Sequence, residues 1–130
     1  MISLAHIKPG MKIFDLGSGD GRLLRLAAEK GARAIGFEIN PFLVLFTKIK
    51  FIFSPYHNSV TVKWKNFWKS DLRDADVVFV YLLPWRMEKL EEFLKNQLKP
   101  GTLVISNSFI FSNLKRIKKD ELNHVYVFKI

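Results

Sequence analysis

The stretch Lys12–Arg22 reads KIFDLGSGDGR and joins a β-type run to a glycine-rich turn. The run ends in the acid Asp15, three glycines alternate with polar residues over Gly17–Gly21, and a segment with helical spacing, Arg22–Lys30, follows at once. A strand, a glycine turn and a helix in this order place backbone N–H groups around a small polar ligand. Glycine permits a positive φ and a close approach of the ligand. We therefore expect a ligand-binding loop at Gly17–Gly21.

A second acid, Glu38, follows Gly17 by twenty-one residues. It lies near the end of the predicted strand Arg33–Ile39, which reads RAIGFEI. An acid at the tip of the second strand of a βαβ unit is placed to accept hydrogen bonds from ribose hydroxyls. The two motifs together indicate a nucleotide-like ligand.

The glycine spacing indicates which ligand of this kind to expect. Dinucleotide sites read G-x-G-x-x-G and hold a pyrophosphate, whereas this loop reads G-x-G-x-G with Asp15 two positions before the first glycine. A carboxylate would repel a pyrophosphate but suits a cation. S-adenosylmethionine carries an ammonium, a sulfonium and a ribose, and its own carboxylate could take the loop N–H groups. The alternative is an ordinary tight turn beside a solvated acid.

The composition indicates one domain, residues 1–130, with a real core, because 48% of the residues are hydrophobic. The absence of cysteine excludes disulfides, a thiolate nucleophile and cysteine-based metal sites, and it fits a reducing compartment, which we expect to be the cytoplasm. Met1–Pro9 is too short and mixed for a signal peptide. The three histidines, His6, His57 and His124, have no metal or triad spacing, so we expect no metal site.

The formal net charge of +9 indicates an acidic partner, which could be RNA, an anionic membrane surface or an acidic protein face. Solubility alone is the other explanation. Basic residues cluster near aromatic ones in two places, Lys63, Lys65 and Lys69, and Lys115, Arg116, Lys118 and Lys119. These clusters could bind RNA or could be solvated faces.

A second helix is predicted over Pro41 to about Phe53, with Asn40 as its N-cap. It is apolar almost all round, yet it is too short and, with Lys48 and Lys50 inside it, too charged to span a bilayer. We do not expect an integral membrane protein. A buried helix is the expectation, and an exposed patch that docks a partner or a membrane is the alternative.

The remaining pattern alternates strands with a helix. Strands are predicted at Val60–Trp64, Asp76–Leu83, Thr102–Ser106, Leu114–Ile117 and His124–Ile130, with a helix from Pro84 to about Leu98 and a charged turn over Lys118–Asn123. This alternation, closed by a hairpin, predicts an α/β, doubly wound parallel sheet with one antiparallel strand. The ligand should lie beyond the carboxyl ends of the first two strands.

Four segments carry a resemblance to a known family: DLGSGDGR, AIGFEINPFLV, DVVFVYLLP and KLEEFLKNQLKPGTLVISNSF. Together they resemble class I, seven-strand S-adenosylmethionine-dependent methyltransferases, and in particular the small protein-lysine methyltransferases. These include archaeal broad-specificity enzymes and mitochondrial enzymes that modify lysines of the ATP synthase c-subunit and of adenine nucleotide translocase. The resemblance implies a Rossmann-like sheet in the order 3-2-1-4-5-7-6, S-adenosylmethionine as cofactor, and a protein substrate with an exposed lysine.

The resemblance also implies roles for particular residues. Asp15 and the loop residues Gly17, Ser18, Gly19 and Gly21 would hold the methionine end of the cofactor. Glu38, with Ile39 beside it, would hold the ribose. Asn66, with neighbouring Phe67, falls where such enzymes read the adenine amino group, although Asn66 could equally be a turn residue.

Tyr81 bears on the reaction class. Enzymes that methylate base or glutamine amines usually carry a D/N-P-P-Y/F motif after this strand, whereas this chain reads Tyr81-Leu82-Leu83-Pro84. Tyr81 could line a lysine channel, where its ring would favour an ammonium, or it could be a buried structural tyrosine. Methyl transfer from a sulfonium needs mainly alignment and desolvation, so we expect no dedicated acid or base.

Eleven residues precede Lys12, whereas members of the family usually carry a longer segment that covers the cofactor. We therefore expect a truncated N-terminal cap, an open site that a partner or a homo-oligomer completes, and weak cofactor affinity of the chain alone. The alternatives to a lysine methyltransferase are an RNA methyltransferase and a non-catalytic cofactor-binding or partner subunit.

Overall fold

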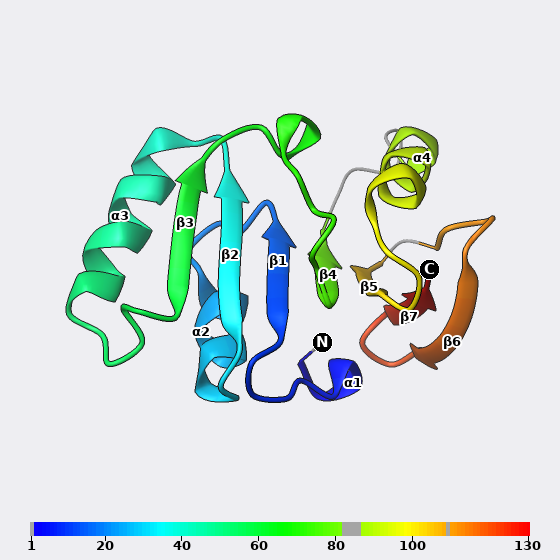
Figure 1. Cartoon of the computed structure of the whole chain (residues 1–130), viewed down its shortest axis with the longest axis horizontal. Coiled ribbons are helices and arrows are strands. Elements are labelled where there is room, and N and C mark those ends of the chain that lie inside the picture. The colour runs from blue at the N-terminus through cyan, green and yellow to red at the C-terminus, as the bar shows by residue number, and fades with distance from the viewer. Residues whose placement is uncertain (1, 82–86, 109) are drawn as a thin grey trace.

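The computed structural model describes residues 2–81, 87–108 and 110–130, which form a seven-stranded sheet in the order β3-β2-β1-β4-β5-β7-β6 (Figure 1). The strands are β1 Lys12–Leu16, β2 Arg33–Glu38, β3 Val60–Trp64, β4 Val77–Val80, β5 Leu103–Asn107, β6 Lys115–Asp120 and β7 Val125–Lys129. Strands β1 to β5 pair in parallel, and β7 is antiparallel to both β5 and β6. The predicted α/β class, strand order and single antiparallel strand are confirmed.

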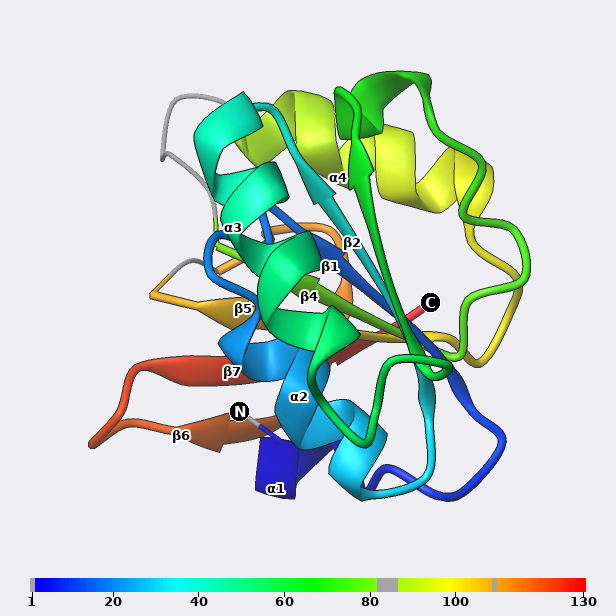
Figure 2. The same cartoon turned by 90° about the vertical axis from the view of Figure 1, so that its left-hand side faces the viewer.

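Helices cover both faces of the sheet. Figure 2 shows α2 (Arg22–Glu29) and α3 (Pro41–Ile52) on the near side of the sheet and α4 (Met87–Gln97) beyond it. The short helix α1 (Ile2–Ala5) lies at the end of the molecule away from the arrowheads of β1 to β3 (Figure 1). One core cluster joins α2 and α3 to the sheet, and a second joins α4 and the short 3-10 helix η1 (Phe67–Lys69) to the opposite face. The chain is thus a three-layer α/β sandwich.

Local sequence signals set the helix starts. The side chain of Asn40 accepts hydrogen bonds from the N–H groups of Phe42 (2.9 Å) and Leu43 (3.3 Å), and Pro41 occupies the first turn, as predicted. Helix α2 follows Gly21, which has a left-handed conformation. The predicted start of α4 at Pro84 lies outside the described residues.

Two strand boundaries differ from the prediction by more than one residue. Strand β4 ends at Val80 rather than continuing to Leu83, and residues 82 and 83 lie outside the described part. Strand β6 continues to Asp120, through the first half of the expected turn over Lys118–Asn123. Strand β6 is an exposed edge strand, so backbone pairing with β7, rather than an apolar pattern, extends it.

The expectation that the helix over Pro41–Phe53 is buried is wrong. Only Val44, Thr47 and Phe51 are buried, whereas Phe42 is 81% exposed and Phe53, the C-cap, is 85% exposed. Helix α3 packs on β2 and β3 at one border of the sheet, and in Figure 2 no other described element lies in front of it. A helix in an outer layer buries only the side that faces the sheet.

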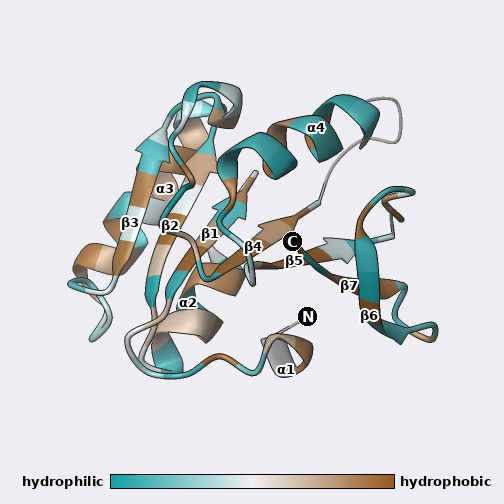
Figure 3. Cartoon of the chain, turned by 45° about the vertical axis from the view of Figure 1, so that its right-hand side comes forward, coloured by the Kyte–Doolittle hydropathy of each residue, from teal (hydrophilic) through white to brown (hydrophobic). Residues whose placement is uncertain are grey.

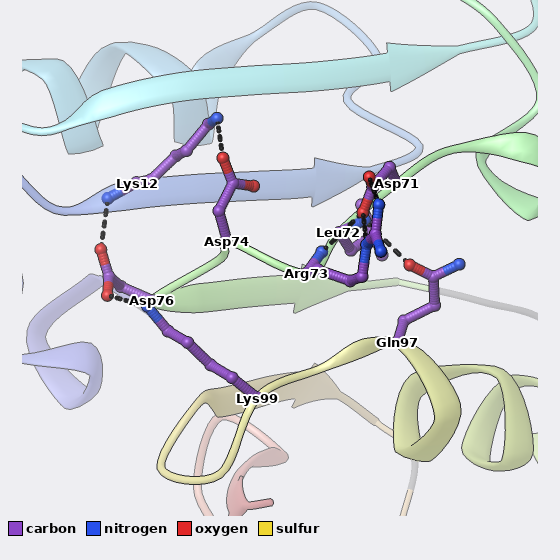
Figure 4. Close-up of polar contacts among 8 residues, drawn as sticks. All are labelled: Lys12, Asp71, Leu72, Arg73, Asp74, Asp76, Gln97 and Lys99. Carbon is purple, nitrogen blue, oxygen red and sulfur yellow. Dashed lines mark hydrogen bonds and ion pairs between the residues drawn. The ribbon is translucent and has the colours of Figure 1, made fainter.

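Two sets of polar contacts hold the starts of β1 and β4 and the segment that leads into β4 (Figure 4). Asp76 accepts hydrogen bonds from the backbone N–H of Lys12 (2.8 Å) and from the Lys99 ammonium (3.2 Å), and Gln97 accepts one from the N–H of Leu72 (3.0 Å). These contacts tie the start of β1 to β4 and to the end of α4. Figure 3 shows the contrast between the largely hydrophilic visible surface of α4 and the hydrophobic strands β4 and β5 that carry the core.

Candidate functional site

The glycine loop between β1 and α2 bends through three left-handed glycines. Their φ angles are 84° at Gly17, 57° at Gly19 and 80° at Gly21. The N–H groups of Gly17 and Ser18 both donate to the carbonyl of Phe37, at 2.9 and 3.0 Å. The loop is therefore anchored to the end of β2.

Glu38 completes this anchor. One carboxylate oxygen accepts a hydrogen bond from the N–H of Gly19 (3.0 Å), and the other accepts one from the N–H of Asn40 (2.9 Å). The structure thus brings Glu38 and the glycine loop together, as the sequence predicts. Because a carboxylate oxygen has more than one acceptor position, Glu38 can hold the loop and still accept from a ligand hydroxyl.

The sequence predicts that N–H groups of the loop bind the carboxylate of the ligand. Four of these N–H groups already donate to acceptors within the protein. Those of Gly17, Ser18 and Gly19 donate as described, and that of Gly21 donates to the carbonyl of Ser18 (3.0 Å). Arg22 instead brings a guanidinium to the pocket wall, and its side chain is 79% exposed and lies 3.9 Å from the Asp20 carboxylate. Sequence reasoning did not select Arg22, although it closes the same motif.

Ser18 is held close to β2. A Cβ built on Gly36 would lie 2.6 Å from both Cβ and Oγ of Ser18 and 2.7 Å from Cδ1 of Leu24. Ser18 is buried, it lines the pocket, and its Oγ has no hydrogen-bond partner among the described residues. An unpartnered buried hydroxyl beside a pocket is a ready group for a polar ligand.

The inner side of α3 supports the loop from behind. The hydroxyl of Thr47 donates to the carbonyl of Gly19 (3.1 Å). A Cβ on Gly21 would lie 2.8 Å from Cγ2 of Thr47 and 2.9 Å from Cε2 of Phe51, so only glycine fits there without displacement. The loop is therefore fixed by contacts with both β2 and α3.

A pocket of about 410 Å³ opens beside the loop, beyond the carboxyl ends of β1, β4 and β5, and its volume falls in the usual range for small-molecule sites. Its lining residues are Asp15, Gly17, Ser18, Asp20, Arg22, Leu23, Phe79, Val80, Tyr81 and Asn107. Four of these are predicted site residues. Tyr81 lies at the pocket rim and is 66% exposed, so the alternative of a buried structural tyrosine is wrong.

Asp15 is a buried carboxyl group in the pocket lining. It is only 4% exposed, and burial raises its pKa to about 7, with a further contribution from the negative charge of Glu38. A cation bound next to it would relieve both effects by stabilising the ionised carboxylate. The pocket therefore favours a ligand with a positive charge at this end.

Three further residues predicted to contact the cofactor, Ile39 beside the ribose and Asn66 and Phe67 beside the adenine, do not line this pocket. Asn66 accepts a hydrogen bond from the N–H of Trp68 (3.1 Å) and caps η1, which is the turn role. Phe67 packs against Trp68 and Phe93, with ring centroids 4.6 and 6.2 Å apart. Ile39 follows Glu38 and is 69% exposed. Contact of these three residues with a cofactor stays a prediction.

The described residues contain neither a cluster of metal ligands nor a membrane-spanning helix. Within residues 2–81, 87–108 and 110–130, no group of three or more histidine, aspartate or glutamate side chains could hold a metal ion. No helix in that part of the chain has the length and apolar content to cross a membrane.

Among solved structures, the chain is similar to an RNA methyltransferase from Salinibacter ruber in complex with S-adenosyl-L-homocysteine. The TM-score is 0.90 at 33% identity, over 98% of this chain and 84% of the other. A methyltransferase from Geobacter sulfurreducens, also with S-adenosyl-L-homocysteine, matches with a TM-score of 0.69 at 20% identity. The second likeness supports the fold alone.

Among curated proteins, the chain is 39% identical over 110 residues to the mouse (Mus musculus) adenine nucleotide translocase lysine N-methyltransferase, covering 84% of this chain and 48% of that protein. The chain thus spans about half the length of the first curated relatives it matches. It is also 32% identical to a protein-lysine N-methyltransferase from Saccharolobus islandicus, over the whole chain and 86% of that protein.

The family assignment rests on most of the chain. Residues 15–118, which include the glycine loop, Glu38 and the strands through β5, match the family described as the ANTKMT methyltransferase domain. The order of the seven strands is that expected for a class I S-adenosylmethionine-dependent methyltransferase. On these grounds, the chain belongs to the ANTKMT methyltransferase domain family.

Proposed function

We propose that this chain binds S-adenosylmethionine in the pocket beside the glycine loop and transfers its methyl group to a lysine side chain of a protein. The observation that carries the proposal is the buried carboxylate of Asp15, which lines a pocket between the glycine loop and the end of β4. The similarity to protein-lysine N-methyltransferases over most of the chain supports lysine as the acceptor.

The groups in and beside the pocket fit this cofactor. Asp15 would hold the ammonium of the methionine end, and the exposed guanidinium of Arg22 would take its carboxylate. Glu38 would accept from the ribose hydroxyls while it keeps its bonds to the N–H groups of Gly19 and Asn40. The unpartnered hydroxyl of Ser18 supplies one more hydrogen bond in the same region.

Asn66 and Phe67 would meet the adenine. Both follow directly on β3, whose neighbour β2 carries Glu38 at its end. The amide oxygen of Asn66 accepts one hydrogen bond in capping η1, and its second acceptor position would take a hydrogen bond from the adenine amino group.

The reaction needs alignment more than it needs a catalytic acid or base. Bound in the pocket, the cofactor supplies an electrophilic methyl group on a sulfonium. Tyr81 stands at the rim, where its exposed ring can hold the incoming lysine by a cation–π contact and exclude water from its path. The lysine reaches Tyr81 as an ammonium and then loses its proton to solvent, so that the neutral amine forms the N–C bond as the S–C bond breaks.

A labelling experiment tests this proposal. The purified chain is incubated with methyl-tritiated S-adenosylmethionine and a lysate cleared of endogenous methyltransferase activity by heating. We expect label in protein bands, and methyl-lysine after hydrolysis. Asp15→Asn should abolish the label, whereas Glu121→Gln, which changes an exposed carboxylate in the turn between β6 and β7, should leave it unchanged.

An RNA acceptor is the second candidate, because the Salinibacter ruber protein with a TM-score of 0.90 is described as an RNA methyltransferase. Lys63, Lys65 and Arg73 line a groove of about 430 Å³ on the face of the sheet opposite α3, which could carry a phosphate backbone. Label in ribonuclease-sensitive material would support this candidate over the lysine proposal. Label in neither fraction would favour a non-catalytic subunit.

A further inference from the structure

The outer side of α3 presents a continuous row of exposed apolar side chains. The row recurs at helical spacing, which places its members on one side of the helix. We call it the outer stripe, and it consists of Phe42, Leu45, Phe46, Ile49, Ile52 and the C-cap residue Phe53, which are 49–85% exposed. A contiguous apolar patch of this kind marks an interaction surface.

The outer stripe is not needed to pack the fold or to support the site. Those tasks fall to the opposite side of α3, where Val44, Thr47 and Phe51 are buried and the Thr47 hydroxyl bonds the glycine loop. Six large apolar side chains on the solvent side of a helix therefore have no role in the described structure.

Trp64 extends the patch at one end. It is 67% exposed at the end of the edge strand β3, and its indole N–H donates to the carbonyl of Ile39 (2.9 Å). Ile39, itself 69% exposed, lies just before α3. An exposed tryptophan beside a phenylalanine-rich helix is typical of surfaces that enter a membrane interface.

The charged residues of α3 itself are all basic. Its twelve residues include two lysines and no aspartate or glutamate. On a helix of 3.6 residues per turn, Lys48 and Lys50 fall on the two flanks of the stripe. Both are exposed, and the Lys50 ammonium also donates a long hydrogen bond to the carbonyl of Asp20 (3.4 Å). Lysines in this position can lie over an apolar surface and direct their ammonium groups to lipid phosphates.

We propose that the outer stripe, with Trp64, docks the protein onto an anionic lipid bilayer. The phenylalanine and leucine side chains enter the boundary between headgroups and acyl chains, while Lys48 and Lys50 meet the negative headgroups. A second copy of the chain fits this surface less well. Pairing of two stripes would bring the lysines of both copies together in chains that each carry a net charge of +9.

Vesicle co-sedimentation tests the proposal. The purified chain is mixed with vesicles of phosphatidylcholine alone or of equal parts phosphatidylcholine and phosphatidylglycerol. We expect binding to the anionic vesicles only. The triple variant Phe42→Gln, Phe46→Gln, Phe53→Gln should bind about tenfold or more weakly, because three apolar insertions are lost. These side chains are exposed, so the variant should keep its wild-type melting temperature.

Matched control variants separate the insertion of α3 side chains into the bilayer from the effect of the overall charge of the protein. The control for apolar insertion is Ile110→Gln with Leu122→Gln, which removes exposed apolar side chains away from α3. The charge variant on α3 is Lys48→Glu with Lys50→Glu. Its control is Lys30→Glu with Lys129→Glu, which changes the net charge by the same amount at exposed positions elsewhere. Only the changes on α3 should weaken binding strongly. The proposal is overturned if anionic vesicles do not bind the chain, if both charge variants lose binding equally, or if the stripe variant instead dissociates a dimer in sedimentation velocity.

Discussion

Gly36 shows how one missing side chain shapes the site. In a strand interior glycine usually costs stability, yet here it leaves the space that Ser18 and Leu24 fill. We predict that Gly36→Ala destabilises the fold by about 1–3 kcal/mol, since the new Cβ would overlap the glycine loop. Urea unfolding measures this change, and calorimetric titration with S-adenosylhomocysteine should show weaker binding by the displaced loop.

A second substitution provides the control for Gly36. Adding Ser18→Gly to Gly36→Ala removes the two Ser18 atoms that lie 2.6 Å from the new Cβ. The double variant should therefore recover much of the lost stability. A double variant no more stable than Gly36→Ala alone would contradict the proposed overlap with Ser18.

Asp15 should make ligand affinity depend on pH. Its pKa of about 7 in the free protein means that at pH 6 most of the carboxyl is protonated and must lose its proton before it can pair with an ammonium. We predict that S-adenosylhomocysteine, which carries that ammonium, binds about tenfold more weakly at pH 6 than at pH 8. Calorimetric titration across this range measures the change. Asp15→Asn should bind weakly with little dependence on pH, and an unaltered pH dependence in that variant would count against the assignment.

The site residues that could be predicted from the sequence are those close together in the chain. Asp15, Gly17 and Glu38 belong to one strand–loop–helix–strand unit, whose geometry follows from local rules. Asn107 reaches the same pocket from β5, which is adjacent only after the sheet has formed. The internal bonding of the Gly17, Ser18 and Gly19 N–H groups also could not be predicted, because their acceptors lie on β2.

At the scale of elements, α3 acts as a support for the glycine loop. Thr47 is fully buried and its hydroxyl donates to the carbonyl of Gly19. We predict that Thr47→Val, which keeps the shape but removes the hydroxyl, costs about 1 kcal/mol of stability. It should also weaken S-adenosylhomocysteine binding, because the loop loses the hydrogen bond that holds Gly19 to α3. Thr61→Val on the exposed side of β3 is the control, and equal effects of the two variants would argue against a specific role of Thr47.

Helix α3 also shows where reasoning from periodicity fails. An apolar residue at nearly every position, such as Val44 or Phe46, predicts a helix correctly but gives no information on which side is covered. Which side of the helix is covered depends on the elements packed around it. Strand β3, on which α3 packs, is the last strand at this edge of the sheet. Capping was predicted well because Asn40-Pro41 acts within a single turn.

At the scale of the whole molecule, the alternation of strands and helices predicts a doubly wound sheet but not the order of its strands. The resemblance of the DLGSGDGR and AIGFEINPFLV segments to a known family supplied that order. The pairing of β7 with β5 joins residues 18 to 26 positions apart, from Asn107 with Val125 to Leu103 with Lys129. No local signal encodes such a contact, because it forms only in the assembled sheet.

Two aspartates at opposite ends of the sheet should set how the stability of the whole protein depends on pH. The pKa of Asp76 is lowered, first by the N–H of Lys12 and then by the Lys99 ammonium, so its contribution is present above the unfolded pKa and is lost as the pH falls. Asp15 acts in the opposite direction. Because its pKa is raised from 3.8 to about 7, its contribution is present at acid pH and is lost as the pH rises through 7.

We therefore predict that the ligand-free protein is most stable near pH 4–5 and loses up to about 4 kcal/mol by pH 8. Urea unfolding at a series of pH values measures this profile. Asp15→Asn should flatten the decline and exceed the wild type in stability at pH 8, although it loses ligand binding, because the buried charge is removed. Saturating S-adenosylhomocysteine should also reduce the decline in the wild type, since its ammonium stabilises the ionised carboxylate. If the free energy of unfolding of the ligand-free wild type instead increased from pH 5 to pH 8, the pKa of Asp15 would not be raised by burial, and the prediction would be wrong.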